Sequence, residues 1–165
     1  MSIPFVRRVA FAGIAAAFVL AGTAAAYAAG PFSGLNGVWN GGGTITLQNG
    51  NRERIRCRAT YAVGDDGASL QQSLRCASDS YNFELRSDVR SDGEAISGSW
   101  NEVSRGVIGN LTGQARRGNI VVQVQSATFN ASLTLVSRGN QQSIEIRSLG
   151  NTEFAGASIT LHRQG

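Results

Sequence analysis

Residues 52–76 read RERIRCRATYAVGDDGASLQQSLRC, and this stretch decides the fold. Polar and apolar side chains alternate strictly over residues 54–61, which is the period-two pattern of a strand with one buried face. The turn-forming run Gly64–Gly67, with two aspartates between its glycines, follows at once. We therefore predict a β-hairpin in which residues 52–63 pair with residues 69–76.

Folding this hairpin at its turn sets Cys57 opposite Cys76 and Tyr61 opposite Gln72. Both cysteines then lie on the apolar face of adjacent strands. In an oxidising compartment such a pair predicts a disulfide, which stabilises by about 3 kcal/mol when it closes a loop of about 20 residues. A metal pair and a reactive thiol are the alternatives, but two cysteines and one histidine, His162, are too few for a zinc site.

The other face of the same strand carries a row of arginines at alternate positions. We call it the arginine row: Arg52, Arg54, Arg56 and Arg58. Their side chains lie about 7 Å apart along a strand, and the predicted register sets Arg75 beside Arg58. Like charges placed opposite each other are destabilising, and the functional interpretation of the row is an anion site for lipopolysaccharide or phospholipid headgroups, a polyanion or an acidic protein face. The alternative is a solvated outer face that is partly neutralised by Glu53, Asp79 or Glu84.

The same alternation continues through the rest of the chain. The expected strands are residues 38–48, 52–63, 69–76, 81–89, 95–103, 107–115, 120–126, 129–136, 143–148 and 155–163. Tight turns such as Asn49-Gly50 join them at spacings of about eight to fourteen residues. This pattern predicts an all-β, antiparallel up-and-down meander of about eight to ten strands. Closure into a barrel is favoured over a sandwich because it removes exposed strand edges.

Small residues recur on the predicted inner face of the barrel. They are Ala59, Gly98, Gly109, Ala131 and Ala157. Such residues either leave room for a cavity or allow the sheet to coil tightly.

The N-terminus has the three parts of a secretory signal peptide. Arg7 and Arg8 precede an uncharged apolar core, and Ala26-Tyr-Ala28 fits the cleavage site. A membrane anchor is the alternative, and Thr23 stands where a lipoprotein needs its acylated cysteine. We expect residues 1–28 to be cleaved, residues 29–36 to form an irregular lead-in and residues 37–165 to form one domain. That domain is expected in the periplasm of a Gram-negative bacterium or outside the cell.

The charge balance of the chain is modest once the signal peptide is removed. All basic residues are arginine, and the formal charge of +4 falls to +2 without Arg7 and Arg8. This bias is too weak to imply nucleic acid. We expect a monomer that does not span a membrane, with a lipid, a small apolar ligand or an anionic envelope component as its partner.

No catalytic pattern is present in the sequence. There is no Gly-x-Ser-x-Gly elbow, no HExxH and no phosphate loop, and the carboxylates are scattered. We expect no enzyme activity, no catalytic residues, no metal and no cofactor.

Two Gly-x-Trp segments suggest where the barrel is closed or where it binds. Trp39 and Trp100 each follow a glycine by two positions, so each indole either plugs a barrel end or lines a ligand cavity. Gly37 and Trp39, with Arg163 or Arg147, resemble the calycin superfamily of lipocalins, fatty-acid-binding proteins and avidins. In lipocalins, such a tryptophan packs beneath an arginine of a late strand. The chain differs in lacking a Thr-Asp-Tyr motif and in suggesting ten strands.

A second resemblance spans most of the chain after the signal. The segments at 42–46, 52–61, 74–81 and 96–100 are similar to a family of small exported alphaproteobacterial proteins of unassigned activity. The resulting prediction is a non-catalytic exported barrel that binds a small apolar or amphipathic ligand or an anionic envelope component. A protein-interaction module, such as a periplasmic protease inhibitor, is the alternative.

Overall fold

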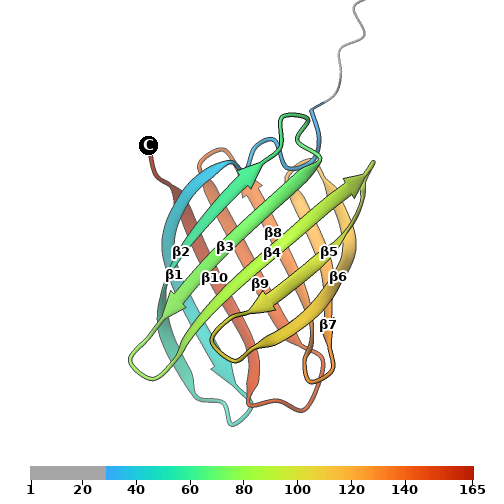
Figure 1. Cartoon of the computed structure of the whole chain (residues 1–165). Helices are drawn as coiled ribbons and strands as arrows, with labels where there is room; N and C mark the ends of the chain where they lie inside the picture. Colours follow the sequence, from blue (N-terminus) through green and yellow to red (C-terminus); the bar gives the residue numbers. More distant parts are fainter. Residues whose placement is uncertain (1–28) are drawn as a thin grey trace, which may run out of the picture.

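The computed structural model describes residues 29–165 as a closed antiparallel barrel (Figure 1). The predicted signal peptide, residues 1–28, lies outside the described residues. Each strand pairs with its neighbours in sequence, and the last pairs with the first, which confirms the predicted up-and-down barrel. The strands are β1 (Gly37–Leu47), β2 (Arg52–Val63), β3 (Ser69–Ala77), β4 (Asn82–Asp92), β5 (Ala95–Glu102), β6 (Val107–Arg116), β7 (Asn119–Ser126), β8 (Asn130–Arg138), β9 (Gln141–Ser148) and β10 (Phe154–Arg163). Among residues 29–165, no helix is long and apolar enough to cross a bilayer.

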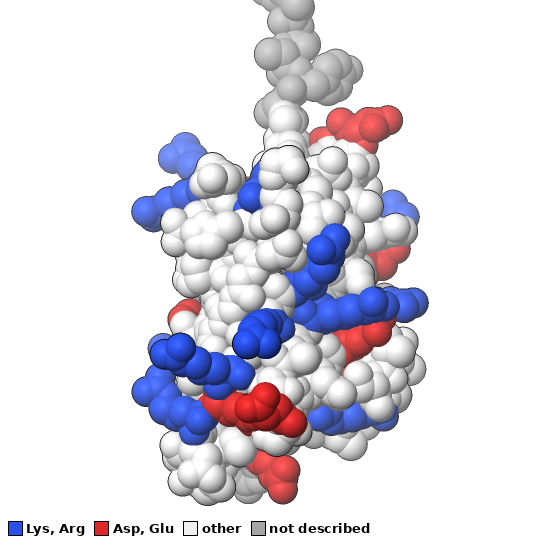
Figure 2. All heavy atoms as spheres, turned by 90° about the vertical axis from the view of Figure 1, so that its left-hand side faces the viewer, with Lys and Arg blue, Asp and Glu red and all other residues white. Residues whose placement is uncertain are grey.

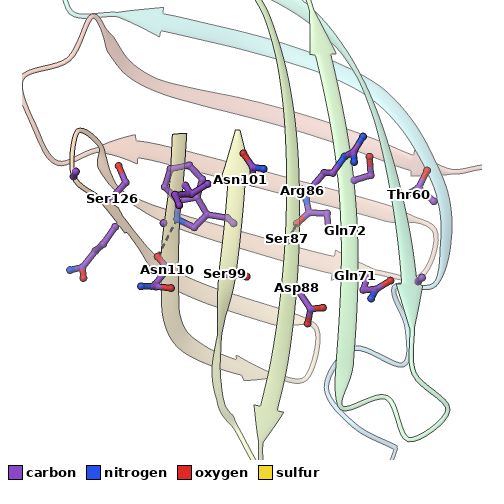
Figure 3. Close-up of a pocket in the computed structure, with 17 residues that line it drawn as sticks. Thr60, Gln71, Gln72, Arg86, Ser87, Asp88, Ser99, Asn101, Asn110 and Ser126 are labelled. Atoms are coloured by element: carbon purple, nitrogen blue, oxygen red, sulfur yellow. Dashed lines mark hydrogen bonds between the residues drawn. The ribbon is translucent and has the colours of Figure 1, made fainter. Parts of the chain in front are cut away.

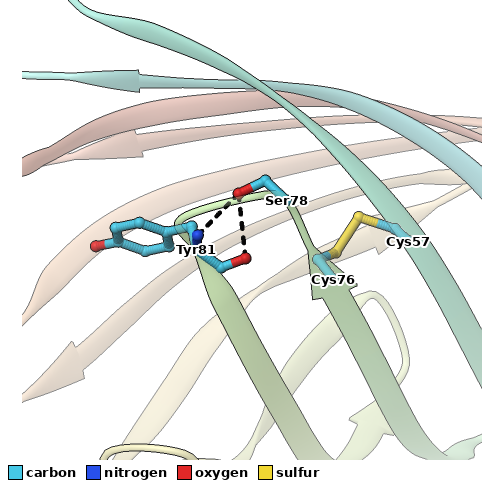
Figure 4. Close-up of a disulfide and its surroundings, with 4 residues drawn as sticks. All are labelled: Cys57, Cys76, Ser78 and Tyr81. Atoms are coloured by element: carbon cyan, nitrogen blue, oxygen red, sulfur yellow. Dashed lines mark hydrogen bonds between the residues drawn. A yellow bond between two sulfur atoms is a disulfide. The ribbon is translucent and has the colours of Figure 1, made fainter.

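The β2–β3 hairpin has the register predicted from its alternation. Cys57 lies opposite Cys76, and Tyr61 lies opposite Gln72. The two cysteines form a disulfide on the buried face of the hairpin (Figure 4). A disulfide of this kind is typical of proteins in an oxidising compartment.

The largest difference from the predicted strand limits is at the end of β4. The sequence suggests a turn at residues 91–93, but β4 continues to Asp92, which pairs with Ala95. Gly93 has a φ of 62°, in the left-handed region that glycine favours. A two-residue turn is therefore sufficient, and residues 90–92 stay in the ladder.

The inward glycines allow the sheet to coil tightly. A Cβ added at Gly41 would lie 2.0 Å from the carbonyl oxygen of Thr160, and one added at Gly43 would lie 1.9 Å from that of Ser158. Gly98 and Gly109 approach neighbouring carbonyl oxygens almost as closely, at 2.1 Å. Small inward residues could either leave a cavity or let neighbouring strands approach closely. Gly98 and Gly109 do the second.

One end of the barrel is sealed by the residues that precede β1. The backbone of Gly30 and Phe32 hydrogen-bonds to the β2–β3 turn, with N–H···O distances of 2.8 and 3.0 Å to Asp66 and Gly67. This attachment places the side chains of Phe32 and Leu35 in the core, where both are buried. We call this the sealed end.

Candidate functional site

The opposite end of the barrel, formed by the β1–β2, β3–β4, β5–β6, β7–β8 and β9–β10 turns, is open. Most inward side chains near the sealed end are buried, although Val63 is half-buried, whereas many apolar ones near these turns are only half-buried. Because their strand positions point them inward, water reaches them through the end of the barrel. These half-buried side chains include Leu47, Phe83, Leu85, Val107, Val124, Phe129, Ile146 and Phe154. This open end, which we call the mouth of the barrel, thus presents half-buried apolar side chains, with Glu53 and Glu102 also at inward positions.

Aromatic rings line part of this open end. Trp100 is 6% exposed and donates a hydrogen bond from Nε1 to the carbonyl oxygen of Asn110 at 3.1 Å. Its ring meets Phe129 edge-on at a centroid distance of 6.2 Å, and Phe129 lies 6.0 Å from Phe154. The half-buried rings of Phe129 and Phe154 present flat apolar surfaces that remain in contact with solvent. Such surfaces suit an apolar or amphipathic molecule.

Trp39 lies at the sealed end, on the other side of the core from Trp100. Its Nε1 donates to the carbonyl oxygen of Leu35 at 2.8 Å, and the guanidinium of Arg163 stacks 4.5 Å from its ring. Arg163 also donates to the carbonyl oxygens of Asn36, at 2.8 Å, and Gly34. Arg163, directly opposite Trp39 on β10, is therefore the arginine of the Gly-x-Trp arrangement.

A polar pair lies in the core between β2 and β9. The hydroxyl of Tyr61 donates to Oε1 of Gln142 at 3.0 Å, and both side chains are buried. Within residues 29–165, Nε2 of Gln142 has no hydrogen-bond partner. Burial raises the pKa of Tyr61 well above its usual range, and the hydrogen bond to Gln142 offsets this only in part. The inward position of Gln142, between apolar inward neighbours, is the sequence signal that identifies it.

Tyr61 is expected to make the protein less stable in alkali. The phenol of the unfolded chain loses its proton at about pH 10. Because the pKa of Tyr61 is raised in the folded state, the folded protein keeps that proton at the same pH. Tyr61 should leave the free energy of unfolding unchanged between neutral pH and that pH, and then lower it by about 1.4 kcal/mol per pH unit. Urea unfolding measured on both sides of that pH should show the fall. Tyr61→Phe should abolish it and Tyr81→Phe should keep it; equal slopes in the two variants would contradict the assignment.

The arginine row lies on the outer wall of β2, on the side of the barrel that faces the viewer in Figure 2. All four side chains are exposed, and none has a carboxylate within 4.0 Å among residues 29–165. Of the three expected neutralising groups, Glu84 pairs instead with Arg75, at 3.2 Å, and with Arg86, at 2.8 Å. Hydrogen bonds from Arg86 and Arg75 lower the pKa of Glu84.

Glu53, the second expected neutralising group, bonds to the β3–β4 turn. It accepts hydrogen bonds from the backbone N–H and the hydroxyl of Ser80, at 3.0 and 2.7 Å, and these lower its pKa. Asp79, the third, makes no ion pair in the described structure. The arginine row is therefore left without local acidic partners.

Two hollows lie on the outer wall of the barrel. The larger crosses β2 to β7 at right angles to the strands and is lined mainly by short polar side chains (Figure 3). Its floor is a row of residues in register, namely Gln71, Asp88, Ser99, Asn110 and Gln125. The smaller hollow lies beside the arginine row and is bordered by Arg56, Arg58, Arg75 and Glu84. The sequence places these residues outward, but it does not show which of them border a hollow.

The residues singled out in the sequence thus fall into three places. Trp39 is in the sealed end, Trp100 is in the open end, and the arginine row with Arg75 is on the outer wall next to the disulfide. No group of three side chains able to hold a metal ion occurs in residues 29–165.

Comparison with known proteins identifies similarity of fold only. No protein-family model and no curated sequence matches the chain. Among solved structures, Rv2717c from M. tuberculosis matches with a TM-score of 0.59 and 15% identity, covering 81% of this chain and 94% of that one. The S-type phycobiliprotein lyase CPES from Guillardia theta matches with a TM-score of 0.56 and 12% identity, covering 81% and 90%. The chain shares the antiparallel barrel of these proteins, which is consistent with the calycin resemblance.

Proposed function

We propose that this chain is an exported, non-enzymatic binding protein that takes a small apolar or amphipathic ligand into the open end of its barrel. The observation that carries the proposal is the difference between the two ends. The sealed end is closed by Phe32, Leu35 and Trp39, whereas apolar inward side chains at the open end are half-buried. Leaving that apolar surface in water costs about 25 cal/mol per Å², which a ligand that covers it recovers.

Two further observations support this function. The Cys57–Cys76 disulfide fits the oxidising compartment to which the predicted signal peptide would deliver the chain. The fold is shared with a phycobiliprotein lyase, although the similarity of 12% identity carries none of that protein's residues over to this chain. The resemblance to small exported alphaproteobacterial proteins is itself a proposal, because no family model matches the chain.

The test is binding of a dansyl-labelled fatty acid to the mature protein. Binding is measured through the change in fluorescence of the dansyl group. Val107 and Ile108 offer a matched pair, because they are adjacent on β6 and point to opposite sides of the wall. Val107→Glu adds a second carboxylate inside the mouth, directly opposite Glu102, and should weaken binding about tenfold or more, since a further unpaired charge is costly beside an apolar ligand. Ile108→Glu adds the same charge to a side chain that is 71% exposed outside and should leave binding unchanged.

Native mass spectrometry of the protein purified from its host, with lipid extraction, provides the second measurement. We expect a bound small molecule that is lost in Val107→Glu and kept in Ile108→Glu. Thermal unfolding of both variants shows whether each is folded. No probe binding by the folded wild type, together with no co-purified molecule, would overturn the proposal; so would equal weakening by the two substitutions.

A further inference from the structure

We propose that the outer wall of β2 and β3 binds a linear polyanion, a single chain with regularly repeated phosphate, sulfate or carboxylate groups, along the arginine row. This site is separate from the open end of the barrel and does not depend on a ligand there. The row lies on the outside of β2, whereas the mouth is formed by inward side chains.

The spacing of the row suits an extended chain. Outward side chains on one strand recur about every 7 Å, so the four arginines present a straight line of positive charge about 20 Å long. Each guanidinium can grip an anionic group with two parallel hydrogen bonds. Because no carboxylate of residues 29–165 pairs with the row, this hydrogen-bonding capacity is free for a ligand.

The smaller hollow beside the arginine row can hold one anionic group of the chain. Arg58 and Arg75 lie directly opposite each other on β2 and β3, and Arg56 lies opposite the short side chain of Ala77. Glu84 holds Arg75 from the β4 side, so its guanidinium is already oriented before a ligand arrives. An anion bound between Arg58 and Arg75 relieves the repulsion of two like charges placed opposite each other.

The strand on the other side of the row leaves room for a chain. The residues of β1 that pair with the four arginines are all uncharged and short or without a side chain, namely Thr46, Thr44, Gly42 and Asn40. Outward residues of β10 beyond them include Ser158 and Thr160, which are also uncharged. A polyanion lying along the row therefore meets no acidic side chain on β1 and no bulky one.

A chain fits this surface better than an anionic membrane does. Proteins that lie on membranes combine basic side chains with apolar ones that enter the bilayer. The exposed large apolar side chains of the described structure are Val103, Ile108, Val121 and Leu149, and none of them lies on β1, β2, β3 or β10. The arginine row is basic and has no exposed large apolar side chain beside it. A flat membrane surface could not enter the hollow next to the row, whereas a single anionic chain could.

The test is isothermal titration of the mature protein with long-chain inorganic polyphosphate at several salt concentrations. Each contact between an arginine and a flexible anionic chain contributes about −0.7 to the slope of the logarithm of the binding constant against the logarithm of salt concentration. The four arginines of the row therefore predict a slope of about −3. Arg54→Gln/Arg56→Gln should weaken binding about tenfold or more and roughly halve this slope. Arg138→Gln/Arg147→Gln removes the same charge from exposed residues of β8 and β9 and should change the binding constant less than about twofold.

Two results would overturn the proposal. They are absence of binding to polyphosphate, whether or not phosphatidylglycerol vesicles bind, and equal loss in the two double variants. The dansyl fatty acid should bind Arg54→Gln/Arg56→Gln as tightly as it binds the wild type. That measurement separates a failure of the polyanion site from a failure of the ligand site in the barrel.

Discussion

Gly43→Ala is expected to destabilise the protein by at least about 3 kcal/mol and to lower its melting temperature by roughly 10 °C. The added Cβ would lie 1.9 Å from the carbonyl oxygen of Ser158 and 2.8 Å from the Cα of Ile159. Both atoms belong to the backbone of β10, so no side chain can rotate away. The barrel can accept the methyl group only if β1 moves away from β10, and that movement strains the hydrogen bonds that close the sheet.

Gly34→Ala is the matched control for this prediction. Gly34 lies in the lead-in, has no atom within 4 Å of an added Cβ and is absent from the residues with positive φ. Its substitution should change the free energy of unfolding by less than about 0.5 kcal/mol. Urea unfolding of the two variants, followed by tryptophan fluorescence, compares them directly. A Gly43→Ala protein as stable as Gly34→Ala would show that β1 and β10 are further apart than described.

The sequence was sufficient to predict the β2–β3 hairpin because three independent constraints agree there. The alternation, the glycines of the turn and the two cysteines all require the same register, with Cys57 opposite Cys76. The end of β4 could not be placed in the same way. Ser91, Asp92 and Gly93 are all turn-forming residues, and only the pairing of Asp92 with Ala95 shows which of them remain in the strand.

The candidate sites were predictable to different degrees. Period-two alternation alone puts the arginine row outside, because it puts Ile55 and Tyr61 inside. Alternation cannot show which acidic groups lie near the row, and Glu53 turns to Ser80 because the β3–β4 turn lies beside it in space. The difference between the open and sealed ends depends on where Phe32 folds back, which no local pattern of the sequence specifies.

Trp39→Ala is the second change with a large expected effect, a loss of about 3–5 kcal/mol in the free energy of unfolding. Trp39 is fully buried, meets Tyr61 edge-on at 6.4 Å and holds the lead-in through its bond to Leu35. Removing the indole leaves a cavity and also frees the segment that seals this end. Thermal unfolding measures the loss, and dansyl fatty acid binding tests whether the open end is disturbed.

Arg163 should couple to Trp39 in a double-mutant cycle. The stacked guanidinium and the hydrogen bonds of Arg163 to the lead-in predict a coupling free energy of about 0.5–2 kcal/mol between Trp39→Phe and Arg163→Gln. Arg147→Gln serves as the control, because Arg147 is exposed on β9 and pairs with Gly156 rather than with Trp39. A coupling as large for Arg147 as for Arg163 would contradict the arrangement. If the coupling is confined to Arg163, then the first and last strands are joined by a side-chain contact as well as by backbone hydrogen bonds. Loss of that contact should open the sealed end and leave the mouth of the barrel intact.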